Sequence, residues 1–284
     1  MTRVRSFYLD IQEWATEDPA SWAEWVAPSP VRASDLKGMG KVQRKTTAAM
    51  HQRVRERLPQ LPTLVDHVER TTDLDLIAVT DHDELSAAHE AREWAARNAY
   101  RVQVVPGVEV STRDGHLLAL FVEERPRALR SLQATAEWVS EKGGICVAPH
   151  PFTRWTHSLQ RRSLAVAIAR GLIAGVEVLN ASLAGRASRR HALVLASEHR
   201  LAEIGSSDAH MLCMVGLART RFAGRTPEDL RRAIETSATQ AAGRFATPGE
   251  MAAEAIPQLA RSMVHLPLRR IVRYARSRSA PRAR

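Results

Sequence analysis

From about residue 61 to residue 235, short apolar runs alternate with longer segments whose apolar positions recur at helical spacing. A short apolar run bounded by turn residues indicates a buried strand, and helical spacing indicates an amphipathic helix. The predicted strands are 74–80, 102–105, 108–112, 116–122, 145–148, 176–181 and 202–206, and the predicted helices are 86–98, 127–143, 164–172, 188–200 and 227–237. We expect Ser86 to cap the first of these helices. Such alternation is typical of an α/β fold with a mainly parallel sheet, either open or closed into a barrel.

The pattern divides the 284-residue chain into three regions. Residues 1–60 form an irregular segment that contains three tryptophans and a basic run from Lys37 to Arg57. Residues 61–235 carry the strand and helix alternation, and residues 236–284 have the pattern of a helical, Arg-rich tail. A single large domain is the natural expectation for a chain of this length.

Composition points to an ordinary globular protein, since 44% of the residues are hydrophobic and 25% are charged. The chain has no apolar run of the roughly 18 residues that a membrane-spanning helix needs. The first residues, MTRVRSFYLDIQEW, lack the apolar stretch of a signal peptide, so we expect a cytoplasmic location. The two cysteines form no C-x-x-C pair, and we expect both Cys146 and Cys213 to be buried thiols.

The formal net charge of +10 favours an anionic partner. Only four of the 41 basic residues are lysines, however, and this skew also fits GC-rich codon usage. From Arg261 to the end there are eight arginines and no acidic residue. This tail can be a solvated basic segment or can contact nucleic acid or another anionic surface.

Metal-competent side chains stand at the ends of several predicted strands. They are Asp81, His82, Asp83, Glu109, His116, His150, Asp208 and His210. Each one alone is more often a satisfied polar residue or, like Asp83, a helix N-cap. Their coincidence at five strand ends favours a common site, because such ends meet at one mouth of an α/β barrel. Imidazole and carboxylate groups are the usual ligands of first-row divalent cations.

At these residues the chain resembles the PHP (polymerase and histidinol phosphatase) family. The matching motifs are I-A-V-T-D-H-D (77–83), P-G-V-E-V-S-T (106–112), G-H-L-L-A-L-F (115–121), A-P-H-P-F (148–152), G-V-E-V-L-N-A (175–181) and G-S-S-D-A-H (205–210). They occur in the family's order and at about its spacing, and V-G-L-A-R-T-R-F (215–222) looks like the family's last strand. The resemblance covers residues 61–235.

The resemblance implies a distorted (β/α)7 TIM-like barrel with up to three divalent ions, which would be zinc, manganese or iron. It implies that Glu109 bridges two ions and that His116 and His150 complete one of those two sites. It also implies that His82 and His210 hold a third ion.

Asp208 would bind the ion that also depends on ligands from the N-terminal part of the chain. Asp81 would orient an imidazole, and Arg221 or Arg154 would neutralise charge on a phosphoryl group. The activity implied is phosphoesterase chemistry on nucleotides or nucleic-acid ends.

One family motif is missing. The family opens with D-x-H-x-H followed by a short S-D-G stretch, whereas residues 41–60 hold His51, no carboxylate before Glu56, and the pattern of a basic helix. We therefore expect fewer ions than in the family. Because the flanking residues still fit the family, we also expect that the DNA encoding Gln43–Gln60, read in another frame, encodes a motif close to D-x-H-x-H.

Three functions remain open from the sequence. The first is a metal-dependent phosphoesterase, impaired or with its missing ligands replaced. The second is a non-catalytic PHP-like module that binds nucleic acid or a protein partner. The third is a hydrolase on a similar barrel that attacks an amide. Metal content, a panel of phosphate esters and salt-dependent nucleic-acid binding would separate them.

Overall fold

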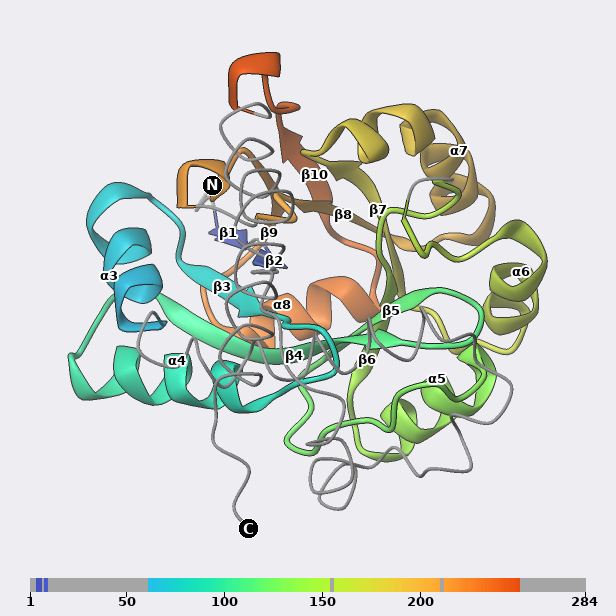
Figure 1. Ribbon diagram of the computed structural model, residues 1–284, viewed down its shortest axis with the longest axis horizontal. Coiled ribbons are helices and arrows are strands. Elements are labelled where there is room, and N and C mark those ends of the chain that lie inside the picture. Colours follow the sequence, from blue (N-terminus) through green and yellow to red (C-terminus); the bar gives the residue numbers. More distant parts are fainter. Residues whose placement is uncertain (1–3, 7, 10–60, 154–155, 210–211, 251–284) are drawn as a thin grey trace, which may run out of the picture.

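The computed structural model describes residues 4–6, 8–9, 61–153, 156–209 and 212–250, and Figure 1 shows their arrangement. The predictions about Arg154, His210, residues 43–60 and the tail from Arg261 fall outside these residues. Among the described residues, none of the helices combines the length and apolar character that crossing a membrane requires.

The larger sheet has seven strands in sequence order. They are β2 (Tyr8–Leu9), β3 (Leu76–Val79), β4 (Gln103–Ser111), β5 (His116–Leu120), β6 (Ile145–Ala148), β7 (Gly175–Asn180) and β8 (Ala202–Ser206). All neighbours are parallel except β5, which runs antiparallel to both β4 and β6. The two predicted strands 102–105 and 108–112 form one continuous strand, β4.

The sheet is curled into a half-barrel (Figure 1). Within the part of the chain that the structure describes, the edge strands β2 and β8 do not pair with each other. The α/β class expected from the sequence is therefore confirmed, whereas a complete seven-stranded (β/α) barrel is not.

A second, three-stranded antiparallel sheet lies beside β8, in the order β1 (Val4–Ser6), β9 (Ala218–Phe222) and β10 (Gln240–Gly243). The Thr220 hydroxyl joins the two sheets, since it accepts from the Gly205 N–H and donates to the Gly205 carbonyl, each at 3.0 Å. The strand beside β3 in the larger sheet is β2, so residues 8–9 fill that position.

Of the helices in the described residues, five cover the convex face of the larger sheet and a sixth lies inside its curve (Figure 1). The outer helices are α3 (Leu61–Thr71), α4 (Ser86–Arg97), α5 (Leu132–Glu141), α6 (Arg161–Ala169) and α7 (Leu183–His199). The inner helix is α8 (Pro227–Glu235), and a short 3-10 turn, η4 (Leu212–Met214), precedes β9. Helix α8 begins with a capping box between Thr226 and Asp229 and with proline in its first turn.

Residues that alternate along each strand pack into two separate cores. Ile77, Val79, Val108 and Val110 face outward and pack with the covering helices. The intervening positions face inward, where Leu76, Ala78, Val105, Leu118 and Ile204 pack with Leu230, Ala233 and Ile234 of α8. Helix α8 thus fills one end of the concave face with apolar side chains.

Two local expectations were wrong. Helix α4 has Leu85 at its N-cap position, and the Glu84 carboxylate accepts from the N–H groups of Leu85 and Ser86, so Ser86 does not cap the helix. Cys146 is buried as expected, but Cys213 is exposed on η4. An apolar neighbourhood in sequence does not guarantee burial when the residue lies on a short connecting turn.

Candidate metal centre

The inward-facing series becomes polar towards the carboxyl ends of the parallel strands. Glu109 continues the inward series of β4 that begins at Val105, and His116 opens the inward series of β5 ahead of Leu118. Ser206 likewise ends the inward series of β8. Because β5 is antiparallel to β4, its first residue, His116, lies beside the last residue of β4, Ser111. The fold therefore gathers side chains that are far apart in the sequence at one end of the concave face.

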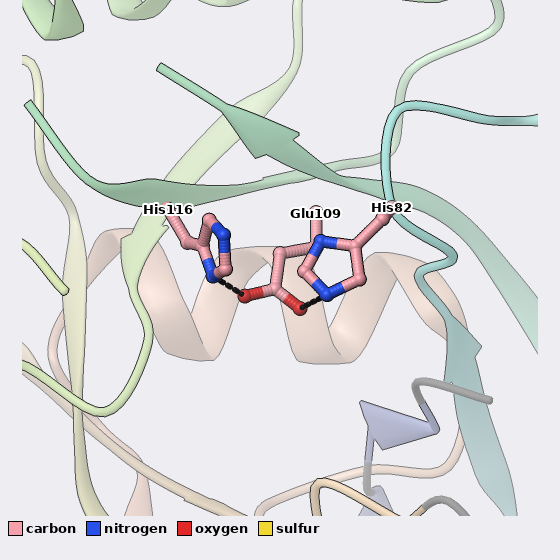
Figure 2. A group of neighbouring side chains, drawn as sticks. All are labelled: His82, Glu109 and His116. Carbon is pink, nitrogen blue, oxygen red and sulfur yellow. Dashed lines mark ion pairs between the residues drawn. The ribbon is translucent and has the colours of Figure 1, made fainter. Parts of the chain in front are cut away.

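Glu109 lies at the centre of this group and is only 3% exposed. Its Oε1 is 2.8 Å from His116 Nδ1 and 3.1 Å from His150 Nε2, and its Oε2 is 3.7 Å from His82 Nε2. Figure 2 shows His82 and His116 on either side of the carboxylate. Each of these three residues offers one ligand atom, and the three atoms lie within 4.8 Å of one another.

The donor set fits a divalent cation. Imidazole nitrogens with one carboxylate suit first-row ions, and all four side chains are largely removed from solvent. His116 Nδ1 is close to Glu109 Oε1 but is not aligned with it as a hydrogen bond. Such a close approach without hydrogen-bond alignment suits two groups that face a common ion.

The charges of the protein groups agree with this arrangement. Burial raises the pKa of the Glu109 carboxyl, but the neighbouring His82 and His116 lower it more, so the pKa lies well below its usual range. Burial lowers the pKa of His150, but the hydrogen bond to Glu109 and its charge raise it to about 9. A bound cation would take over the role of the imidazolium charge, because imidazoles ligate metal in their neutral form.

Three residues that follow strands have left-handed backbone conformations. The φ angles are 52° at Asp83, 26° at His150 and 48° at Asp208. Positive φ is uncommon for residues other than glycine, and such strained positions tend to gather at functional sites. These three positions aim side chains out of the regular strand direction.

A second buried carboxylate, Glu177 on β7, lies next to the first group and was not predicted as a site residue. Its Oε2 accepts from the His150 backbone N–H at 2.7 Å and from Asn180 Nδ2 at 3.0 Å. Its Oε1 accepts from the Ser206 hydroxyl. Burial raises the pKa of Glu177, His150 lowers it and Asp208 raises it further, which brings it to about 7. A carboxylate in the apolar run G-V-E-V-L-N was the available sequence signal.

Two residues of the loop after β6, His157 and Ser158, also reach the group and were not predicted as site residues. The exposed His157 ring lies 5.3 Å from the His116 ring, measured between centroids. Ser158 Oγ lies 2.9 Å from His150 Nδ1, so both ring nitrogens of His150 have polar partners. Nothing in the sequence pattern placed this loop beside β5.

The other predicted site residues are placed as follows. The Asp208 carboxylate accepts from Asn180 Nδ2 at 3.0 Å. The same Nδ2 donates to Glu177, so Asn180 links the two carboxylates. Asp81 is buried, and its carbonyl accepts from the Glu109 N–H at 3.2 Å. Asp83 accepts from the Ser111 N–H at 2.7 Å and thus ties β3 to β4 rather than capping α4.

Arg221 lies on β9 in the smaller sheet, opposite Arg5 and Gln240. Its contact with a phosphate group stays a prediction. His210 lies outside the described residues, so its part in binding an ion with His82 also stays a prediction.

Comparisons with known proteins give one family-model match and two relatives by sequence. A family model described as PHP-associated matches residues 186–239. An uncharacterized protein of Methanocaldococcus jannaschii, MJ1587, is 31% identical over 121 residues, which are 42% of this chain and 66% of that protein. A second one, MJ0417, is 30% identical over 162 residues, which are 54% of this chain and 61% of that protein.

A solved structure from Bacteroides vulgatus, a two-domain protein containing a predicted PHP-like metal-dependent phosphoesterase, shares the fold with a TM-score of 0.58. The sequence identity is 17%, and the likeness covers 86% of this chain and 65% of that one. The chain thus spans slightly less than two thirds of each of these three proteins.

The fold and site define an α/β protein with a half-barrel sheet and an imidazole and carboxylate centre at its strand ends. The match of residues 186–239 to the PHP-associated family model and the shared fold support the PHP-domain family for this chain. The resemblance drawn from the sequence motifs is thereby confirmed.

Proposed function

We propose that this protein is a metal-dependent phosphoesterase. The observation that carries the proposal is the buried Glu109 carboxylate with the imidazoles of His82, His116 and His150 around it. A structural core has no need of three imidazoles against one carboxylate, because buried charge must be offset at considerable energetic cost. The arrangement is typical of a site that binds a divalent cation.

Glu109, His116 and His150 would hold one ion, and His82 would help to hold a further one. A bound divalent ion would supply a nucleophilic water near neutral pH and neutralise charge on the phosphoryl group. The protein's own residues fix the carboxylate, exclude bulk water and keep the imidazoles in place. Asp81 would orient an imidazole, and Arg221 would bind the phosphate of the substrate.

The finer proposal concerns ion and substrate. We propose zinc, manganese or iron as the ion, and fewer than the family's three ions, because no D-x-H-x-H motif is present. Nucleotides or nucleic-acid ends are the proposed substrates, since the net charge of +10 favours anionic partners. Hydrolysis of the phosphate ester would depend entirely on the bound ion.

Hydrolysis of a generic phosphoester by metal-loaded protein tests the proposal. Glu109→Gln removes the central negative charge with little change of shape and should abolish both metal retention and hydrolysis. His199→Ala, an imidazole on the exposed side of α7, is the matched control and should retain both.

Two outcomes would refute the phosphoesterase. Metal-loaded protein that binds RNA or DNA in a salt-sensitive way without turnover would indicate the non-catalytic module. Turnover confined to amides would indicate the third function, a hydrolase on a similar barrel that attacks an amide.

A further inference from the structure

Two predicted ligands, His150 and Asp208, lie outside the regular strand pairing of the sheet. Other contacts must therefore hold their backbone in place. His150 and Asp208 have φ angles of 26° and 48°, and both lie just beyond the ends of their strands, β6 and β8. A side chain in such a position persists only when the surrounding structure over-determines it. The strand between these two in the sheet is β7, which carries Glu177 and Asn180.

Glu177 contacts both neighbouring strands. Its Oε2 accepts from the His150 N–H at 2.7 Å, beyond the end of β6, and its Oε1 accepts from the Ser206 hydroxyl at the end of β8. The glutamate is 3% exposed and Ser206 is fully buried at 0%. Both carboxylate oxygens are therefore hydrogen-bonded within the protein and do not face bulk solvent.

Asn180 extends the same connection to Asp208. Its Nδ2 donates to Glu177 Oε2 at 3.0 Å and to Asp208 Oδ2 at 3.0 Å, which uses both amide hydrogens. The orientation of the amide is fixed, because its Oδ1 accepts from the Ser182 N–H at 2.9 Å and a backbone N–H can only donate. Asn180 itself is 1% exposed.

We propose that Glu177, acting together with Asn180, is a positioning residue that sets metal affinity by holding His150 and Asp208 in their left-handed conformations. The inference rests on the proposed metal-dependent function. Glu177 does this through hydrogen bonds to a backbone N–H and to an amide, so what matters is its acceptor oxygen rather than its charge. Partners that orient metal ligands in this way typically influence metal affinity by about 10–100-fold.

Two substitutions of Glu177 separate the hydrogen bonds from the charge. Glu177→Gln can keep every contact, with its carbonyl oxygen towards His150 and Asn180 and its amide donating to Ser206 Oγ. Glu177→Leu has a similar size but leaves the His150 N–H and the Asn180 amide without an acceptor. Asn180→Ala breaks only the arm to Asp208 and should have an intermediate effect.

The experiment measures the affinity of the full chain for Co²⁺ and the visible absorption of the bound ion at saturation. Glu177→Leu should bind Co²⁺ about 10–100-fold more weakly than wild type, with an altered spectrum because His150 is displaced. Glu177→Gln should restore both affinity and spectrum. The control is Thr135→Val, which removes a buried hydroxyl on α5 away from the site and should leave both unchanged.

The outcomes are distinguishable. Unchanged affinity and spectrum in Glu177→Leu would overturn the positioning role while leaving the metal site intact. A Glu177→Leu protein with a lower melting temperature and the wild-type spectrum at saturation would show a merely structural role and would also overturn it. Loss of the ion in Glu177→Gln as well would identify Glu177 as a direct ligand. A wild-type chain that binds no divalent ion would overturn this inference and the proposed function together.

Discussion

Replacement of His150 by alanine is the sharpest perturbation of the centre. His150 is 5% exposed, its Nε2 lies 3.1 Å from Glu109 Oε1, and its Nδ1 lies 2.9 Å from Ser158 Oγ. Histidine and alanine both carry a Cβ, so the steric restriction at a φ of 26° is similar in the variant and the main change is the loss of the imidazole. The expected loss can therefore be assigned to the side chain.

The magnitude follows from the number of ligands. Four-ligand structural zinc sites gain about 10–16 kcal/mol on binding, so one ligand accounts for about 3 kcal/mol on average. A loss of about 3 kcal/mol weakens affinity roughly 100-fold or more, since each 1.4 kcal/mol is a factor of ten. At micromolar protein concentration, the most complete site, formed by Glu109, His116 and His150, should then lose its ion.

The assay is metal content after dialysis, measured by atomic emission on wild type and variant side by side. His157→Ala is the matched control, because this exposed imidazole lies 5.3 Å from the His116 ring but is not among the predicted ligands. The control should keep its ion. Full metal content in His150→Ala would refute the ligand assignment, and loss of metal in His157→Ala alone would move the assignment to His157.

Three further predictions concern the fold around the site. Leu230→Ala should destabilise the protein by about 2–5 kcal/mol, because Leu230 on α8 is 2% exposed and packs inside the curled sheet; an unchanged chemical denaturation midpoint would contradict this packing. A thiol reagent should label Cys213 quickly and Cys146 only on unfolding, since Cys146 is buried and burial raises its pKa to about 12; mass spectrometry of the labelled peptides checks this, and fast labelling at Cys146 would be inconsistent with the fold. Hydrogen bonds from Trp94 and Tyr100 lower the pKa of Asp66, so its stabilising contribution is present above the unfolded pKa and is lost as the pH falls through the folded one. Asp66→Asn should therefore reduce the melting temperature at neutral pH and converge with wild type in acid; a difference that does not change with pH would speak against this tie between α3 and α4.

Strand and helix alternation was sufficient to predict the α/β class and most elements, because each element buries one face and its period appears in the sequence. The apolar runs 145–148 and 202–206 match β6 and β8 residue for residue. Turn geometry was less predictable. Cys213 lies on a short exposed turn, and α4 is capped by Glu84 from outside the helix, and neither feature leaves a periodic signal.

The structure brings His82, Glu109 and His116 together. These three residues stand out in the sequence because ligand-type residues at strand ends are few and the strands themselves were recognisable. Glu177 and Asn180 were missed because they lie inside an apolar strand, where a polar residue gives no indication of its partner across the sheet. His157 and Ser158 reach the centre through the path of a loop, which periodicity cannot predict.

The origin of the strand beside β3 is a further difference. The first strand of the family was expected at residues 41–60, upstream of Asp81, whereas the strand beside β3 is Tyr8–Leu9. Strand β2 pairs with β3, and β1 just before it pairs with β9; both partners are distant in sequence. Residues 43–60 lie outside the described residues, so the proposed frame change remains a prediction about the DNA.

The proposed function requires that this centre binds a divalent ion and uses it to hydrolyse a phosphate ester. The most direct measurement titrates metal-free protein with Mn²⁺ or Zn²⁺ and follows bound metal and hydrolysis of a generic phosphoester in the same samples. We expect at least one tightly bound ion per chain, with hydrolysis that rises in proportion to occupancy and disappears on chelation. A chain that binds no ion, or that fills the site without any hydrolysis, would contradict it.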